Sequence, residues 1–411
     1  MKDMRTRVNF LPLLCTLCAL VCLTTPEVPA QSSAGEFQRI LNEKAAFQPS
    51  DFAALEQGQT IVKLTPITDK REIAMCGLVT LRTSADQFLR TYLENMTRQN
   101  NQTILEAGRF GTAPAVADLQ QLTIDAAEIE DLKACVAGDC SLKLSAKMIE
   151  RLRREVDWDA SDYEAQATLL LKTMLTEYVR DYVARGPEAL IEYHDKRNRI
   201  RLADEQQALG SASGYLTDLL REAGSGMQVV EDVIIWSKIK FGLKPVLVIN
   251  HVRAYKPERE TGLQVLVASN QIYATHYFTS SLALTAFVSV PGASPYLVFE
   301  NRSRTDGLVG PFSKLKRGVI EKKSAEHRLL GLDRLRRNAR RFDLRIPDDR
   351  AYGLCHLHAA VSAFVKLGRG MGGEESHVRI YRKKRAVASP SFVPQKDVRV
   401  LGFTAPRRRR R

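Results

Sequence analysis

Two short apolar segments, residues 60–64 and 72–81, open the folded part of the chain and have the length of β-strands. Apolar side chains then recur every fourth residue, at Phe88, Tyr92 and Met96. This spacing places them on one face of a helix over residues 85–96, which begins after the capping residue Ser84. The pattern predicts strand, strand and helix.

From about residue 117 to 225 the apolar spacing is that of helices. Ser145 is expected to cap one helix, and Ser161 with Glu164 matches a capping box at the start of a longer one. The longer helix is expected to end at Gly186-Pro187. Further helical stretches are expected over 187–194 and 203–223. The pattern therefore predicts a helical insertion.

Between residues 229 and 304 the hydrophobic period changes to two, as in half-buried strands. The alternation is clearest over 232–239 and 246–253. Further strands are expected over 264–274, 280–290 and 296–304. Four or five strands with such short connections are expected to be antiparallel neighbours.

After the sheet, residues 314–342 predict one long basic helix. Its apolar stripe consists of Leu329, Leu332, Leu335, Ala339 and Phe342. A helix with such a stripe can cover one face of an antiparallel sheet. The expected fold class is α+β, with an antiparallel sheet, a long C-terminal helix and a helical insertion.

The first thirty residues have the features of a secretory signal peptide. A basic opening leads into an apolar run from Phe10 to Leu23, too short to span a bilayer comfortably, and then to Val28-Pro29-Ala30. A retained N-terminal anchor is the alternative. The expected organisation is a signal peptide (1–30), an N-terminal linker (31–59), an α+β domain (60–349) and a basic, mostly disordered tail (350–411). The mature protein is expected to be soluble and periplasmic or secreted.

The 411-residue chain carries a formal net charge of +14, which is concentrated near its end. Residues 311–411 hold 27 Lys and Arg against 9 Asp and Glu, so residues 1–310 have a net charge of −4. A basic end suggests nucleic acid in the cytoplasm, but export makes that partner unlikely. The basic region is then expected to bind an anionic membrane surface or an acidic glycan, or to have no specific partner.

Cys76, Cys135, Cys140 and Cys355 remain once the predicted signal peptide is removed. Cys135 and Cys140 enclose a four-residue turn-forming insert, which predicts a local disulfide in an oxidising compartment. Zinc is the less favoured reading, because a single C-x4-C pair lacks a second ligand pair. The pairing of Cys76 and Cys355 stays open.

The predicted order of elements over residues 60–100 and 230–345 resembles the START-like helix-grip fold. That resemblance implies a curved sheet wrapped around a long C-terminal helix with an apolar cavity between them. Separately, four short motifs look like those of an uncharacterised group of bacterial exported proteins. They are Trp236-Ser237-Lys238, Gly242-Leu243-Lys244-Pro245, Asn270-Gln271-Ile272-Tyr273 with His276-Tyr277-Phe278, and Asn301-Arg302-Ser303-Arg304. This likeness implies an envelope protein and carries no known catalytic residues.

The sequence contains no zinc-protease, α/β-hydrolase, Walker, dinucleotide-binding or EF-hand motif. The polar and aromatic residues of the predicted sheet are therefore the candidates for a site. If the faces of the strands coincide, a ligand-binding set would comprise Trp236, His251, Arg253, Tyr273, His276, Glu300 and Arg302. The alternative is that Glu300 and Arg302 form a cross-strand ion pair on a solvent face and that the histidines are structural. No metal or cofactor is expected.

Two functions are compatible with this set. The first is an exported envelope protein that holds a hydrophobic or lipid-like ligand in a cavity between sheet and helix, with the basic C-terminal region approaching anionic membrane. The second is a hydrolase- or cyclase-like enzyme with His276 or His251 as general base. A dry cavity favours binding, whereas His276 within hydrogen-bond reach of Glu300 favours catalysis.

Overall fold

The computed structural model describes residues 39–96 apart from 40 and 44, then 104–213, 226–241, 244–258, 262–289 and 294–305, and the single positions 308, 317, 318 and 321. The chain divides into two compact units, residues 1–380 and 381–411, and every described residue belongs to the first. The predicted signal peptide, the tail from 350 onwards and nearly all of the predicted helix over 314–342 lie outside the described residues.

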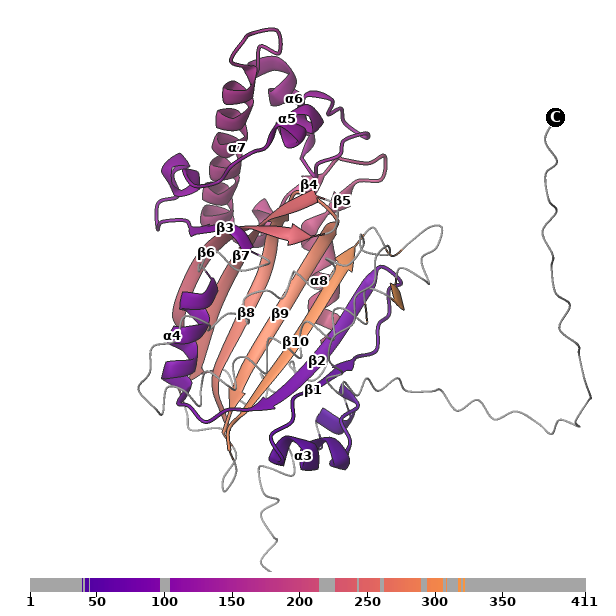
Figure 1. Cartoon of the computed structure of the whole chain (residues 1–411), viewed down its shortest axis with the longest axis vertical. Helices are drawn as coiled ribbons and strands as arrows, with labels where there is room; N and C mark the ends of the chain where they lie inside the picture. The colour runs from indigo at the N-terminus through magenta and orange to yellow at the C-terminus, as the bar shows by residue number, and fades with distance from the viewer. Residues whose placement is uncertain are drawn as a thin grey trace, which may run out of the picture. The chain divides into compact units, whose positions relative to one another are not determined.

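Eight antiparallel strands form the main sheet, in the order β1-β2-β10-β9-β8-β7-β6-β3 (Figure 1). Their bounds are β1 Ile61–Leu64, β2 Glu72–Thr80, β3 Ile104–Arg109, β6 Met227–Phe241, β7 Lys244–Pro257, β8 Leu263–Ala274, β9 Phe278–Val288 and β10 Tyr296–Thr305. The predicted strands and their antiparallel pairing are confirmed. The four or five strands expected over residues 229–304 are five, β6 to β10. The sheet is larger because β1 and β2, also predicted as strands, join it beside β10, and because β3 adds to β6 at the other edge.

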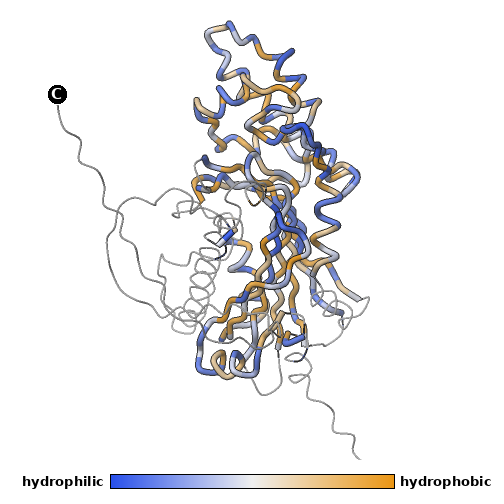
Figure 2. Tube along the Cα trace, turned by 90° about the vertical axis from the view of Figure 1, so that its right-hand side faces the viewer, coloured by the Kyte–Doolittle hydropathy of each residue, from blue (hydrophilic) through white to orange (hydrophobic). Residues whose placement is uncertain are grey.

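Helix α4 (Ala85–Met96) covers one face of the sheet, and its bounds match the prediction. Phe88 and Tyr92 of α4 pack in one apolar cluster with residues such as Val252, Val267 and Phe299. Helix α8 (Leu202–Ala212) lies on the opposite face, as Figure 1 shows. The hydrophobic residues follow the strands between these helices, as Figure 2 shows. The sheet is therefore buried by helices on both of its faces.

The predicted N-terminal linker contributes to the folded unit. Residues 49–56 form helix α3 (Pro49–Glu56), and Phe52 and Leu55 pack with Leu78 and Val298 on the face of the sheet opposite α4. The Lys63 ammonium on β1 forms a buried ion pair with Asp51 of α3. This helix is thus attached to the sheet by both apolar and charged contacts.

Apart from α8, the insertion lies beyond one end of the sheet (Figure 1). It comprises the 3₁₀ turn η1 (Val116–Leu119), α5 (Ala126–Lys133), α6 (Ala146–Glu155), α7 (Tyr163–Arg185), the 3₁₀ turn η2 (Gly186–Ala189), the two-stranded pair β4 (Glu192–Tyr193) and β5 (Ile200–Arg201), and α8. Ser145 caps α6 as predicted, since its hydroxyl accepts from the Met148 amide. Tyr178 and Tyr182 of α7 are buried.

Two local predictions for the insertion are wrong, and a third lies partly outside the described residues. The capping box from Ser161 is not formed, because α7 is preceded by Asp162, whose side chain makes no capping hydrogen bond. Residues 187–194 are not helical, since η2 ends at Ala189 and Glu192 then pairs with Arg201 in β4 and β5. Helix α8 ends at Ala212, and residues 214–225 lie outside the described residues. None of the described helices is long and apolar enough to cross a membrane.

Candidate functional site

The predicted site residues of the strands lie on one face of the sheet, which is the face opposite α4. His251 pairs with Asn270, Asn270 with Leu282, and Leu282 with Arg302. Paired residues on neighbouring strands point to the same side of the sheet, so His251 and Arg302 share one face. Three strand spacings separate His251 from Arg302, roughly 14 Å at about 4.8 Å per strand. The structure therefore places these residues on a common face but does not bring them together in one cluster.

His251 belongs to a hydrogen-bonded group at the β6 side of the sheet. Its Nε2–H donates to Oδ1 of Asp232 at 2.6 Å, and its Nδ1 accepts from the Tyr182 hydroxyl at 2.8 Å. Nε of Arg253 donates to the other Asp232 oxygen at 2.9 Å. Burial lowers the pKa of His251, and the Asp232 carboxylate offsets only part of that effect. Both ring nitrogens are thus engaged.

Tyr273 and His276 lie at the insertion end of the sheet. Tyr273 is fully buried between Tyr178 and Tyr193, with ring centroids 6.3 Å from each, and burial raises the pKa of its hydroxyl. Nδ1–H of His276 donates to the Ser141 carbonyl at 2.9 Å. Trp236 lies near this end too, where its indole N–H donates to the Asp118 carbonyl at 2.9 Å. These residues attach the insertion to the sheet.

Glu300 and Arg302 belong to a buried charge network on β10. Arg302 pairs with Glu72 at 2.5 Å and with Glu300 at 2.8 Å, and all three side chains are buried. The Ser213 hydroxyl donates to the other Glu300 oxygen at 2.5 Å. Burial raises the pKa of Glu300, against the opposing effects of Arg302 and Ser213. A solvent-face ion pair is therefore excluded for Glu300 and Arg302.

The same network extends to α8. Arg304 pairs with Glu205 of α8 at 2.7 Å, and Glu205 also pairs with Arg71 at 3.1 Å. Sequence reasoning missed Glu72, Ser213 and Glu205. Glu72 could have been found, because a carboxylate at the start of an apolar strand is unusual; Ser213 and Glu205 gave no signal before the position of α8 was known.

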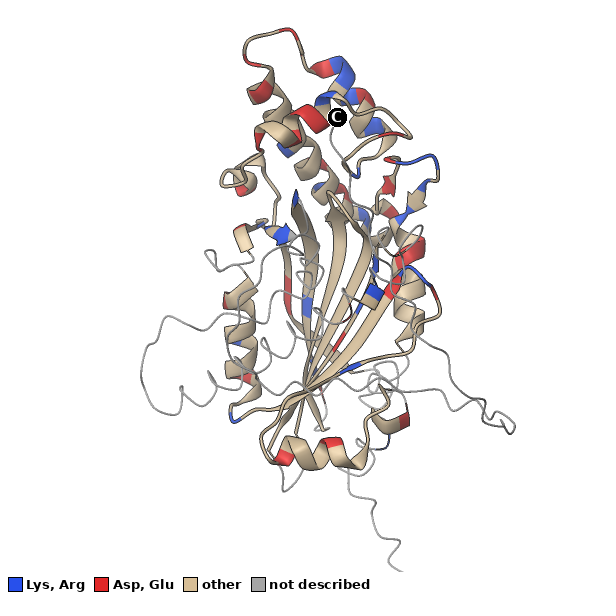
Figure 3. Cartoon of the chain, turned by 45° about the vertical axis from the view of Figure 1, so that its right-hand side comes forward, with Lys and Arg blue, Asp and Glu red and all other residues tan. Residues whose placement is uncertain are grey.

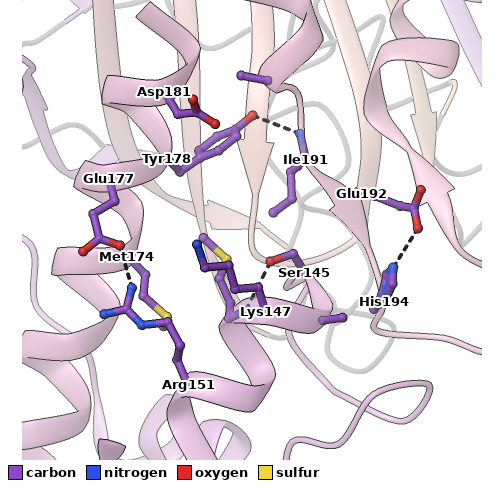
Figure 4. Close-up of a pocket in the computed structure, with 13 residues that line it drawn as sticks. Ser145, Lys147, Arg151, Met174, Glu177, Tyr178, Asp181, Ile191, Glu192 and His194 are labelled. Carbon is purple, nitrogen blue, oxygen red and sulfur yellow. Dashed lines mark hydrogen bonds and ion pairs between the residues drawn. The ribbon is translucent and has the colours of Figure 1, made fainter. Parts of the chain in front are cut away.

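A pocket of about 560 Å³ lies within the insertion, between α6, α7 and the segment that leads into β4 (Figure 4). It is lined by Ser145, Ala146, Lys147, Met148, Arg151, Met174, Glu177, Tyr178, Asp181, Ala189, Ile191, Glu192 and His194. None of the seven predicted site residues lines it. The sequence offered one indirect signal, since Glu177 and Asp181 flank the buried Tyr178 on one face of α7.

The charges around this pocket are mostly compensated. Arg151 pairs with Glu177 at 2.5 Å, and Nε2 of His194 lies 2.7 Å from Oε1 of Glu192. The hydrogen bond and charge of Arg185, with a smaller contribution from Lys147, hold the pKa of Asp181 below its usual value. Lys147 is exposed and makes no hydrogen bond or ion pair with any residue in the described part of the chain. It is the lining cation without an ion-pair partner among the described residues, although its charge acts on Asp181.

The floor of the pocket is apolar and continuous with the sheet. Met148, Met174 and Ile191 are buried there. The Tyr178 hydroxyl donates to the Ile272 carbonyl of β8 at 2.6 Å, so this side chain connects the pocket to the sheet. The arrangement can hold a molecule with an apolar part and one charged group.

Cys135 and Cys140 are at disulfide distance, with Cα atoms 4.5 Å apart, which is consistent with the predicted bond. Among the described residues, no group of three His, Cys, Asp or Glu side chains could hold a metal ion. No family model, curated protein or solved structure matches this chain.

Proposed function

We propose that the chain is an exported binding protein for a small, lipid-like anionic amphiphile, held in the pocket between α6, α7 and β4. The observation that carries this proposal is the position of Lys147, an exposed cation without an ion-pair partner among the described residues, which lines a pocket with a buried apolar floor. A pocket of about 560 Å³ is within the size range of small-molecule sites in proteins.

The charge of the expected head group follows from the pocket's ion pairs. Glu177 is paired with Arg151, Asp181 with Arg185, and Glu192 with His194. A cationic head group would have to displace one of these partners. An anionic head group meets Lys147 directly, together with the amides at the start of α6, where a helix favours negative charge.

The expected apolar part follows from the floor. Met148 and Met174 are flexible, polarisable side chains that adapt to irregular apolar ligands. Together with Ile191 they offer an apolar contact surface to an acyl chain or a similar group. Binding there would remove apolar ligand surface from water, at roughly 25 cal/mol per Å².

Two features support the exported, helix-grip-like part of the proposal. The cysteine pair at disulfide distance favours an oxidising compartment. The long strands β2 and β10 pair with each other within one antiparallel sheet, and the residues after β10 are those predicted to form the terminal helix. A cavity between this sheet and the predicted helix over 314–342 is a second proposed site for a hydrophobic ligand.

The alternative function is a hydrolase- or cyclase-like activity. The specific observation in its favour is the imidazole of His251, which Asp232 orients as carboxylates orient general bases. His276 is oriented only by a backbone carbonyl, and its Nε2 is buried without a hydrogen-bond partner among the described residues, so a substrate would have no open access to it. Tyr182 occupies the remaining nitrogen of His251, so substrate would have to displace that hydroxyl.

The test is displacement of a fluorescent fatty-acid analogue from the purified protein, with mass spectrometry of co-purifying molecules. Lys147→Glu should weaken binding of the anionic probe about tenfold or more, because attraction becomes repulsion. Arg90→Glu on the solvent face of α4 makes the same change in net charge and should leave binding unchanged. Absence of binding, or equal effects of the two variants, would refute the pocket as the site.

A further inference from the structure

The short pair β4 and β5 carries a concentration of positive charge that the proposed ligand pocket does not use. The connection from His194 to Arg199 contains Lys196, Arg197 and Arg199, and Arg201 follows in β5. All four cations are exposed. Figure 3 shows Lys and Arg gathered on this pair of strands. We call residues 194–201 the basic hairpin.

The one acidic residue of the basic hairpin is turned inward. Asp195 is buried, and its carboxylate lies 3.6 Å from the equally buried ammonium of Lys143. That pair removes the only negative charge between residues 193 and 203 from the surface. The exposed charges within residues 194–201 are therefore all cations, whereas the carboxylates of Glu192 and Asp204 lie beside them.

The three arginines of this segment are held only loosely by neighbouring carboxylates. Arg199 and Arg201 have side chains 71% and 65% exposed, and lie 3.9 and 4.0 Å from Glu192. Arg201 also lies 3.5 Å from Asp204. Arg197 makes no hydrogen bond or ion pair with any described residue. These long side chains are free to turn towards an external partner.

The base of the basic hairpin is fixed by the loop between Cys135 and Cys140. The Gly138 amide donates to the His194 carbonyl at 2.8 Å, and the Cys140 amide donates to the Asp195 carbonyl at 3.0 Å. The two cysteines close this loop at disulfide distance. The backbone of the hairpin is therefore ordered before any partner binds, which lowers the entropy lost on binding.

We infer that the basic hairpin docks on an anionic phospholipid surface. A site for one free phosphate would have buried donors, whereas these cations are exposed. The pocket of about 520 Å³ that Lys196, Arg199 and Arg201 line is shared with the carboxylates of Glu192, Asp204 and Glu205, which disfavour a single bound anion there. Diffuse exposed cations match the field of a negatively charged membrane, to which each contributes separately. The inference is separate from the basic tail and from the ligand pocket, and it stands if either of those assignments fails.

The test is vesicle binding by the purified full chain, with phosphatidylglycerol–phosphatidylcholine vesicles as the probe. Arg197→Glu with Arg199→Glu should weaken binding by about thirtyfold or more, since two membrane-facing cations are lost and two repulsive charges are added. Arg90→Glu with Arg154→Glu on α4 and α6 makes the same change in net charge away from the hairpin, and should have a much smaller effect.

Further arms separate the sources of binding. Replacement of Arg407 to Arg411 by glutamine in the full chain should weaken binding independently, so that the hairpin variant retains its effect in that background. Binding should fall as salt rises, should be absent with pure phosphatidylcholine, and should not be competed by millimolar inorganic phosphate. Equal effects of the hairpin and control variants, effective competition by inorganic phosphate, or tighter binding of DNA than of the vesicles would overturn the inference.

Discussion

The hydroxyl of Tyr182, near the end of α7, donates to Nδ1 of His251 on β7 at 2.8 Å, and the two rings meet edge to face with centroids 5.4 Å apart. This contact joins the helical insertion to the sheet across 69 residues of sequence. Because Asp232 fixes the ring from the other side, the insertion helix has one defined position on β7.

Tyr182→Phe is expected to lower the free energy of unfolding by about 1 kcal/mol, because it leaves the buried Nδ1 acceptor without its donor. Urea denaturation of the variant and the parent protein measures the difference. Tyr163→Phe is the matched control, since the Tyr163 hydroxyl bonds to Glu130 in an exposed position; its expected change is below about 0.5 kcal/mol. Equal losses of unfolding free energy in both variants would contradict a stabilising hydrogen bond between Tyr182 and His251.

Stability should depend on pH through His251 and His276, whose pKa values are both lowered chiefly by burial. The unfolded chain binds a proton at each histidine near pH 6.5, whereas the folded chain binds it only at lower pH. Between those two values the unfolded state holds more protons, so the free energy of unfolding rises with pH. The histidine contribution is fully present above about pH 6.5 and is lost as the pH falls towards the folded-state pKa.

The measurement is the midpoint of thermal unfolding between pH 7.5 and 5.0 for the parent, His251→Asn, His276→Asn and the double variant. Each substitution should lower stability near pH 7.5 and should also reduce the fall in midpoint on acidification. Around His251 the facing groups are Tyr182, Asp232 and Arg253, and none of them is altered in this comparison. An unchanged slope in the double variant would contradict the prediction.

Arg302→Met should destabilise the protein by about 3–5 kcal/mol, because it leaves the buried carboxylates of Glu72 and Glu300 without their shared cation. Glu300→Gln should cost much less, within about 1 kcal/mol at neutral pH, since burial already disfavours the charged form of Glu300. Chemical denaturation measures both. Arg154→Met on the exposed side of α6 is the control for loss of an arginine, and equal costs for Arg302→Met and Arg154→Met would refute the buried network.

The Cys135 and Cys140 pair should contribute about 2 kcal/mol to stability, since it closes a short loop in the unfolded chain. Replacement of both cysteines by serine should lower the free energy of unfolding by that amount without unfolding the protein at room temperature. A reducing agent should lower the parent to the level of the double variant and leave the double variant unchanged. A reducing agent without effect on the parent would show that the bond does not form.

Strands β6 to β10 could be predicted from sequence because each is a long segment rich in apolar side chains, and β7, with Val246, Val248 and Val252 at alternate positions, is the clearest case. The residues that contact the predicted site residues could not be predicted from sequence. Tyr182 meets His251, and Ser213 meets Glu300, only because α7 and α8 cross the sheet, and no local pattern encodes that crossing. The ligand pocket was missed for the same reason, since its walls come from separate elements of the insertion.

Strand β3 was missed because Gly108 weakens its hydrophobic pattern, and the structure shows why glycine stands there. A Cβ atom at position 108 would lie 2.7 Å from Nε1 of Trp236 and 2.8 Å from two further indole carbons. Those distances are shorter than any ordinary contact, so the ring or the strand must move. The ring cannot move freely, because its N–H donates to the Asp118 carbonyl at 2.9 Å and its surface is 1% exposed.

Gly108→Ala is therefore expected to destabilise the protein by about 1–3 kcal/mol, through overpacking against Trp236. Gly210→Ala is the matched control, because Gly210 lies inside α8 and a Cβ there meets no atom within 4 Å. Alanine at that position should stabilise the helix by about 0.5–1 kcal/mol. Thermal unfolding compares the two, and tryptophan fluorescence should change only for Gly108→Ala. Two changes of the same sign, or an unaltered Trp236 environment in Gly108→Ala, would contradict the close approach of β3 to β6.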